Sequence, residues 1–292
     1  MTMLPDALAR PGATGRLNGP RLQSYGRAVG MNLLRARRFR RGLRGMFQPV
    51  AYWRSIEYRL VWNAASFQRS DRVLDVGSPK LLSLYLAERV GAEVFSTDIE
   101  DYFVDEYQFL RASRRISTER LHIEVQDGRR LGYPDNSFTK AYSISVIEHI
   151  PDNGDSDCIR EIGRVLAPGG ECFITVPFWR TSRQVYRKPD FYWAGASAAS
   201  ADGRVFYERH YSEEDLYRRL INPSGLRLRR IEYVGERILT GSELEIADLP
   251  AFMGPLEPLI SRLVHVRAPD WRELKKPLCA FMVLRKEAPH AG

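Results

Sequence analysis

The sequence has little cysteine, little histidine and no long apolar run. Its 292 residues include three cysteines and five histidines, and their spacing matches no zinc or redox motif. The best apolar run, residues 278–284, is far shorter than the roughly 18 residues that cross a bilayer. We therefore expect reduced, buried thiols, no bound metal and no transmembrane segment. The start also lacks the pattern of a secretory signal peptide.

Acidic residues are scarce in the first 50 residues. Residues 1–50 contain ten Arg, no Lys and one acid, Asp6, which gives +9, whereas the whole chain carries +8. The remainder is therefore at −1, and the basic charge belongs to an N-terminal arm. We expect this arm to be loose over residues 1–30 and helical from Met31. In that helix one side would be apolar, formed by Leu33, Phe39, Leu43, Met46 and Phe47.

Three interpretations of the arm stay open. It is a solvated, partly helical extension that covers the fold, an element that binds an anionic membrane surface through residues 31–47, or a binder of RNA or another polyanion. We do not expect nucleic acid, because no recognisable nucleic-acid module accompanies the arm. A mitochondrial transit peptide is also Arg-rich, but this arm is poor in Ser. We therefore expect a cytoplasmic protein, peripheral to a membrane if the arm binds lipid.

Beyond the arm, short apolar strands alternate with amphipathic helices. Strands are predicted at 72–76, 93–97, 122–125, 140–145, 171–176, 227–234 and 279–285, and helices at 51–68, 80–90, 155–166 and 212–220. This alternation predicts an α/β fold, a doubly wound, mostly parallel sheet with helices on both faces. We expect one domain over 51–286 with substrate-side insertions at about 178–211 and 236–277, followed by a tail at 287–292.

Acidic residues stand at the ends of the first three predicted strands: Asp75, Asp98 and Asp127. Ligands of open α/β sheets bind at the carboxyl ends of the strands, and a carboxylate there accepts from both hydroxyls of a ribose. The phosphate loop G-x-G-x-x-G is absent, because Ser-Pro-Lys follows Gly77. A nucleoside without phosphates therefore fits better than the dinucleotide of a dehydrogenase.

Four segments in order carry a family resemblance: VLDVGSP (73–79), STDIE (96–100), VQDGRRLGYPDNSFTKAYSISVIEHI (125–150) and RVLAPGGECFITVPF (164–178). They resemble the successive motifs of class I S-adenosylmethionine-dependent methyltransferases, most closely the type 11 methyltransferase domain. The resemblance covers residues 52–180 well. It implies a Rossmann-like sheet of seven strands whose last strand is antiparallel, and S-adenosylmethionine as the cofactor.

The resemblance also assigns cofactor-binding positions. It implies that Asp75 and Gly77 line the pocket for the methionine end, that Asp98 binds the ribose hydroxyls, and that Asp127 faces the adenine amino group. The full set that it implies is Asp75, Gly77, Ser78, Asp98, Ile99, Asp127, Gly128 and Ser145. One departure is that Pro79 and Leu81 replace the second and third glycines of the family's D-x-G-x-G-x-G loop.

Two functions stay open at this point. The first is methyl transfer from S-adenosylmethionine to a small-molecule, lipid or glycan-linked acceptor. The second, suggested by Pro79 and Leu81, is a non-catalytic methyltransferase-like protein that scaffolds a partner through its Arg-rich arm. The candidate catalytic residues are His149, His210 and Tyr211, because His serves as a general base near neutral pH. For each of them a purely structural role is the alternative.

Overall fold

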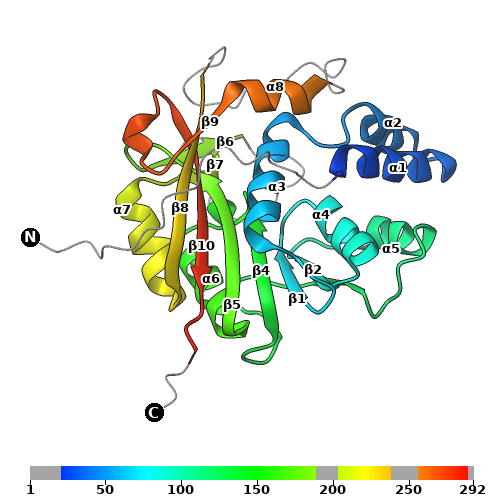
Figure 1. Ribbon diagram of the computed structural model, residues 1–292, viewed down its shortest axis with the longest axis horizontal. Helices are drawn as coiled ribbons and strands as arrows, with labels where there is room; N and C mark the ends of the chain where they lie inside the picture. Colours follow the sequence, from blue (N-terminus) through cyan, green and yellow to red (C-terminus); the bar gives the residue numbers. More distant parts are fainter. Residues whose placement is uncertain (1–20, 189–202, 238–255, 289–292) are drawn as a thin grey trace, which may run out of the picture.

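The computed structural model describes residues 21–188, 203–237 and 256–288. Predictions that fall on 1–20, 189–202, 238–255 and 289–292 lie outside the described residues. In the described part, eight strands form one sheet in the order β3-β2-β1-β4-β5-β10-β8-β9 (Figure 1). Their bounds are β1 Arg72–Val76, β2 Glu93–Asp98, β3 Leu121–Val125, β4 Phe138–Ile144, β5 Leu166–Pro177, β8 Arg227–Glu236, β9 His265–Ala268 and β10 Pro277–Arg285.

The first five strands are parallel, and β10 runs antiparallel to both of its neighbours, β5 and β8. The helices are α1 Leu22–Arg35, α2 Phe39–Phe47, α3 Tyr52–Ala65, α4 Leu81–Tyr85 continued by η1 Leu86–Val90, α5 Val104–Ser113, η2 Ile147–His149, α6 Gly154–Val165, α7 Glu213–Asp215 continued by η3 Leu216–Ile221, and α8 Glu257–Val264. Separate apolar clusters cover the two faces of the sheet. The predicted doubly wound fold is therefore confirmed.

The two predicted insertions contribute strands of their own. β9 lies in the predicted insertion at about 236–277, and it pairs with β8 as an eighth, edge strand. In the other insertion, β6 Arg183–Arg187 pairs with β7 Val205–His210 as a separate hairpin. These strands are short and half polar, so their alternation is too weak to predict. The Pro-Gly-Gly segment at 168–170 lies inside β5.

The N-terminal arm differs from its prediction in two ways. Residues 22–30, predicted to be loose, belong to α1, where Tyr25 and Val29 are buried. The single apolar stripe from Leu33 to Phe47 is also wrong, because the chain turns between α1 and α2 at Arg37, whose φ is +59°. The two helices touch at glycines: a Cβ on Gly30 would lie 2.7 Å from the Gly45 carbonyl carbon.

We expect His265 to make the stability of the fold depend on pH. Its ring packs on Tyr52 and Trp53, and burial lowers its pKa to about 4. Between pH 6.5 and 4 the unfolded chain binds a proton that the folded chain refuses, so this stability is present above pH 6.5 and is lost as pH falls. We expect His265 to lower the unfolding free energy by about 3 kcal/mol over this range.

Urea titrations at several pH values would measure this effect. His265→Gln should flatten the profile, whereas the control His122→Gln, on β3, should keep it. Identical pH profiles for wild type and His265→Gln would contradict the assignment.

Candidate active site

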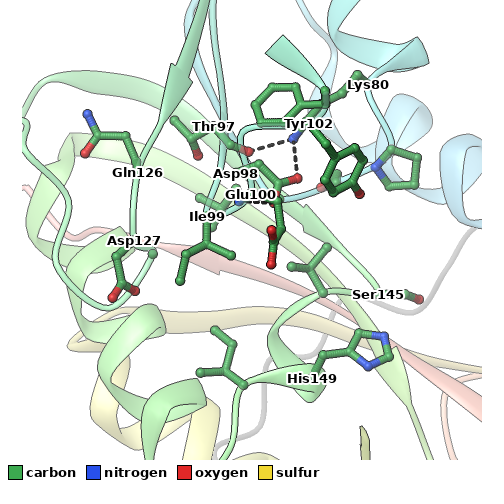
Figure 2. Close-up of a pocket in the computed structure, with 18 of the residues that line it drawn as sticks. Lys80, Thr97, Asp98, Ile99, Glu100, Tyr102, Gln126, Asp127, Ser145 and His149 are labelled. Atoms are coloured by element: carbon green, nitrogen blue, oxygen red, sulfur yellow. Dashed lines mark hydrogen bonds and ion pairs between the residues drawn. The ribbon is translucent and has the colours of Figure 1, made fainter. Parts of the chain in front are cut away.

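A cavity of about 870 Å³ opens at the edge of the sheet where the parallel strands end (Figure 2). Its walls come from the chain segments that follow β1, β2, β3 and β4, and from side chains of α2, α3 and α5. The strand order reverses between β1 and β4, and the cavity lies in front of that point. Ligands of doubly wound sheets bind at this switch point.

Asp98, at the end of β2, presents a carboxylate to the cavity. Its Oδ2 lies 3.4 Å from the ammonium of Lys80, which donates to the Thr97 carbonyl at 2.6 Å (Figure 2). The Lys80 ammonium also lies 5.1 Å from the centre of the Phe103 ring. Lys80 thus fixes Asp98 while leaving lone pairs that can accept from a diol. Sequence reasoning missed Lys80, because it occupies a variable position of the loop motif.

Gly77 and Ser145 bring the ends of β1 and β4 together. Gly77 has φ +69°, and a Cβ there would lie 2.5 Å from Val146 Cγ1, so only glycine fits. Ser145 also has a positive φ, +47°, and its hydroxyl donates to Glu57 at 2.5 Å. Ser78 lines the same wall. This wall is therefore built by tight backbone turns.

Asp75 does not line the cavity. Its side chain is completely buried and accepts from the Ser78 backbone N–H at 3.1 Å and from the Ser83 and Ser96 hydroxyls. Burial raises the pKa of this carboxyl, against the opposing charge of Lys80. Asp75 thus holds the turn that carries Gly77. The resemblance had instead implied that Asp75 lines the pocket for the methionine end of the cofactor.

The loop after β3 forms the opposite wall. Asp127 lies there with its carboxylate in a two-pronged pair with Arg129, at 2.7 Å from Nη2, and these hydrogen bonds hold its pKa below the usual range. A Cβ on Gly128 would lie 3.0 Å from Cys158 Sγ, so this loop packs closely on α6. Ile99 adds an exposed apolar side chain. Apart from Asp75, every implied cofactor position lines this one cavity.

The three catalytic candidates separate in space. His149 lines the cavity, and its Nδ1 lies 2.7 Å from the Tyr207 carbonyl oxygen. His210 is buried on β7 and pairs with Glu208. Tyr211 is fully buried and donates to Asp155 at 2.9 Å. Neither the His210 nor the Tyr211 side chain lines the cavity, so their catalytic role stays a prediction that this geometry does not support.

Two buried acids, Glu57 and Glu148, lie next to residues that line the cavity, and sequence reasoning missed Glu57. Glu57 of α3 accepts from Arg54 at 2.6 Å and from Thr175 at 2.7 Å, besides Ser145. Glu148 has one oxygen with no hydrogen-bond partner among the described residues, and burial raises its pKa well above the usual value. The sequence did contain a signal for Glu57, because this residue is the first acid that follows the long stretch without acids after Asp6.

Metal ligands do not gather at this site. In the described ranges, no group of three or more His, Cys, Asp or Glu side chains could hold a metal ion. The three cysteines are buried and form no disulfide. The polar groups that face the cavity are carboxylates, hydroxyls and backbone groups, which suit an organic ligand with amino and hydroxyl donors.

Residues 74–174 match the sequence model of a family described as a methyltransferase domain. Over this segment the chain is similar to a methyltransferase domain. Methyltransferase GfsG of Streptomyces halstedii is 32% identical over 108 residues, which cover 35% of this chain and 36% of that protein. The 27-O-demethylrifamycin SV methyltransferase of Amycolatopsis mediterranei is 31% identical over 115 residues, covering 37% and 40%. The matched segment thus spans well under half of either curated relative.

A likeness in fold extends beyond the matched segment. The crystal structure of the [4+2]-cyclase SpnF superimposes with a TM-score of 0.51 at 20% identity, over 79% of each chain. At this identity the likeness concerns the fold alone.

Proposed function

We propose that this protein transfers a methyl group from S-adenosylmethionine to a small-molecule, lipid or glycan-linked acceptor. The observation that carries the proposal is the convergence of Gly77, Asp98 and Asp127 on one cavity from successive strand ends. In this proposal Asp98 holds the ribose hydroxyls, because an ionised carboxylate accepts two charge-assisted hydrogen bonds. Asp127 and the adjoining loop face the adenine, and the turns at Gly77 and Ser145 hold the methionine end.

The residues present fit such a cofactor. The cavity offers acceptors for hydroxyl and amino groups, an apolar wall at Ile99, and a volume suited to a nucleoside and a second molecule. When bound, the cofactor supplies the reactive methyl sulfonium. The chain supplies position and orientation, which is where proteins contribute to such displacements.

Isothermal titration calorimetry with S-adenosylhomocysteine tests the proposal. Binding by the intact chain supports it, and the absence of binding by folded protein would refute it. Transfer of a labelled methyl group in a cell extract, with mass identification of the product, then identifies the acceptor.

The alternative function is a methyltransferase-like protein that acts as a scaffold through its Arg-rich arm. Pro79 and Leu81 favour it, because they occupy loop positions where the family has glycine. Pro79 lines the cavity, and its carbonyl accepts from the Tyr58 hydroxyl at 3.1 Å. Any labelled product in the extract experiment would exclude this alternative.

His149 is proposed to accept the proton of a hydroxyl or amine acceptor. The Tyr207 carbonyl can only accept a hydrogen bond, so Nδ1 carries the hydrogen and Nε2 carries the basic lone pair. Burial lowers the pKa of His149, so the ring is neutral at pH 7 and can accept a proton. We expect His149→Gln to lower kcat about 100-fold.

The pH profile separates this role from a structural one. The wild-type rate should fall only below pH 6.5, as His149 becomes protonated, and the variant should lose that acid limb. His122→Gln is the matched control. Equal rates for His149→Gln and wild type would contradict the role.

We also propose that the protein is cytoplasmic and peripheral to an anionic membrane, with residues 31–47 as the contact. No helix in the described ranges is long and apolar enough to span a bilayer. Most of this segment lies in α2.

A further inference from the structure

Helix α2 exposes a row of large apolar side chains. Phe39, Leu43 and Phe47 recur every four residues, so they share one face of the helix, and each is between 49% and 61% exposed. Single exposed apolar residues are common on soluble proteins, but an aligned row marks a surface that contacts something. The opposite side of α2 packs on α1 through Gly42 and Gly45.

Helix α8 repeats the arrangement. Leu256, at its N-terminal cap, together with Leu259 and Leu263, is between 53% and 64% exposed. On its inner side the Ser261 hydroxyl accepts from Arg59 of α3 at 3.0 Å and bonds Ser55 at 2.8 Å. The three leucines therefore lie away from α3.

The two helices belong to the same end of the molecule. The chain leaves α2 at Phe47 and begins α3 at Tyr52, and α8 packs on the first turns of α3. Figure 1 shows α2 and α8 along one edge, the edge toward which β5 runs. The cavity opens toward this edge too, and Arg41 of α2 lines it and pairs with Glu106 of α5.

Along α2 the charge has one sign, whereas α8 begins with an acid, Glu257. No acidic residue occurs between Asp6 and Glu57. Four arginines in and beside α2 are exposed next to the apolar row: Arg35, Arg37, Arg40 and Arg44. On α8, Arg262 is exposed next to Leu263. Large apolar side chains flanked by guanidinium groups suit the boundary between acyl chains and anionic headgroups. A polyanion such as RNA would use the arginines but leave both apolar rows in water.

We propose that the outer faces of α2 and α8 together form a docking surface for a membrane that contains anionic lipid. Docking there places the mouth of the cavity, beside Arg41, at the lipid surface. Docking there favours an amphipathic acceptor drawn from the bilayer, which deepens the proposed function. The choice of acceptor rests on the proposed function, but the docking surface itself does not.

Vesicle co-sedimentation of the full chain tests the surface. We expect binding to vesicles of phosphatidylcholine with about one third phosphatidylglycerol, weak binding to phosphatidylcholine alone, and weakening by salt. Combined Phe39→Ser, Leu43→Ser and Phe47→Ser changes should lower the bound fraction at least about tenfold, and Leu259→Ser with Leu263→Ser should lower it by a similar factor. The controls Val125→Ser and Tyr217→Ser remove exposed apolar side chains elsewhere.

The result is independent of methyl transfer. Calorimetry with S-adenosylhomocysteine on the same variants measures cofactor binding. A failure of the proposed function and a failure of docking are therefore distinguishable. The proposal is overturned if wild type ignores anionic vesicles, if the α2 and α8 variants bind like the controls, or if these faces instead join copies of the chain, seen as a dimer that the variants convert to monomer. Binding of single-stranded RNA that survives the apolar substitutions, without vesicle binding, would assign the arginines to nucleic acid and also overturn it.

Discussion

Replacement of Asp98 by alanine is expected to weaken the binding of S-adenosylhomocysteine about 1,000-fold. A carboxylate that accepts from two ribose hydroxyls makes two charge-assisted hydrogen bonds of about 2 kcal/mol each, and the sum corresponds to this factor. Lys80 holds the carboxylate at the end of β2 before any ligand arrives, so little reorganisation offsets the gain. Isothermal titration calorimetry measures the effect directly.

Two controls separate binding from folding. Asp98→Asn keeps one acceptor oxygen in place and should recover part of the affinity, whereas Asp101→Ala removes an exposed acid that does not line the cavity and should change nothing. The circular dichroism spectra should be unchanged in all three. Wild-type affinity in Asp98→Ala would show that the end of β2 does not hold the ribose.

The position of the site was predictable, because it follows from topology. Parallel strands that alternate with helices end at one edge, so residues that follow successive strands meet there whatever the packing is. This is why Asp98, Asp127 and Ser145 line one cavity. The direction of a side chain at a strand end is a different matter. Asp75 and Asp98 look alike in the sequence, but β1 is central, and the Asp75 carboxylate is closed in by Ser83 and Ser96.

The groups that sequence reasoning missed depend on contacts between distant segments. Glu57 is a single acid on a helix that the sequence predicts from its apolar face. Only the packing of α3 against the ends of β4 and β5 gives Glu57 its partners Ser145 and Thr175. Residues 22–30 of α1 escaped prediction because two of the inward residues there are glycines, Gly26 and Gly30. Glycine reads as a loop signal until the partner that needs the close approach is known.

The same dependence on distant contacts explains the polar cluster behind His149. The Asp155 carboxylate of α6 is fully buried and accepts from Arg209 of β7 at 2.8 Å and from Arg219 of η3 at 2.7 and 2.8 Å. Tyr211 adds a fourth hydrogen bond. One carboxylate thus fastens α6, the β6–β7 hairpin and η3 together, and β7 carries the Tyr207 carbonyl that orients His149.

Removing the Asp155 carboxylate should therefore be costly. Asp155→Ala leaves two buried guanidinium groups without their counter-charge, and we expect the free energy of unfolding to fall by about 4 kcal/mol. Urea denaturation measures this as a lower midpoint at an unchanged slope. Asp157→Ala is the matched control, since Asp157 lies two residues away on α6 and pairs with Arg160 at the exposed surface.

The control should change stability by less than about 0.5 kcal/mol, because an exposed ion pair contributes little. Equal midpoints for the two variants would show that the buried cluster does not stabilise the fold. If Asp155→Ala instead destabilises as expected, then at temperatures where it stays folded its kcat should approach that of His149→Gln. Loss of the clamp on β7 frees the carbonyl that fixes the tautomer of His149, so stability and activity would depend on the same buried carboxylate.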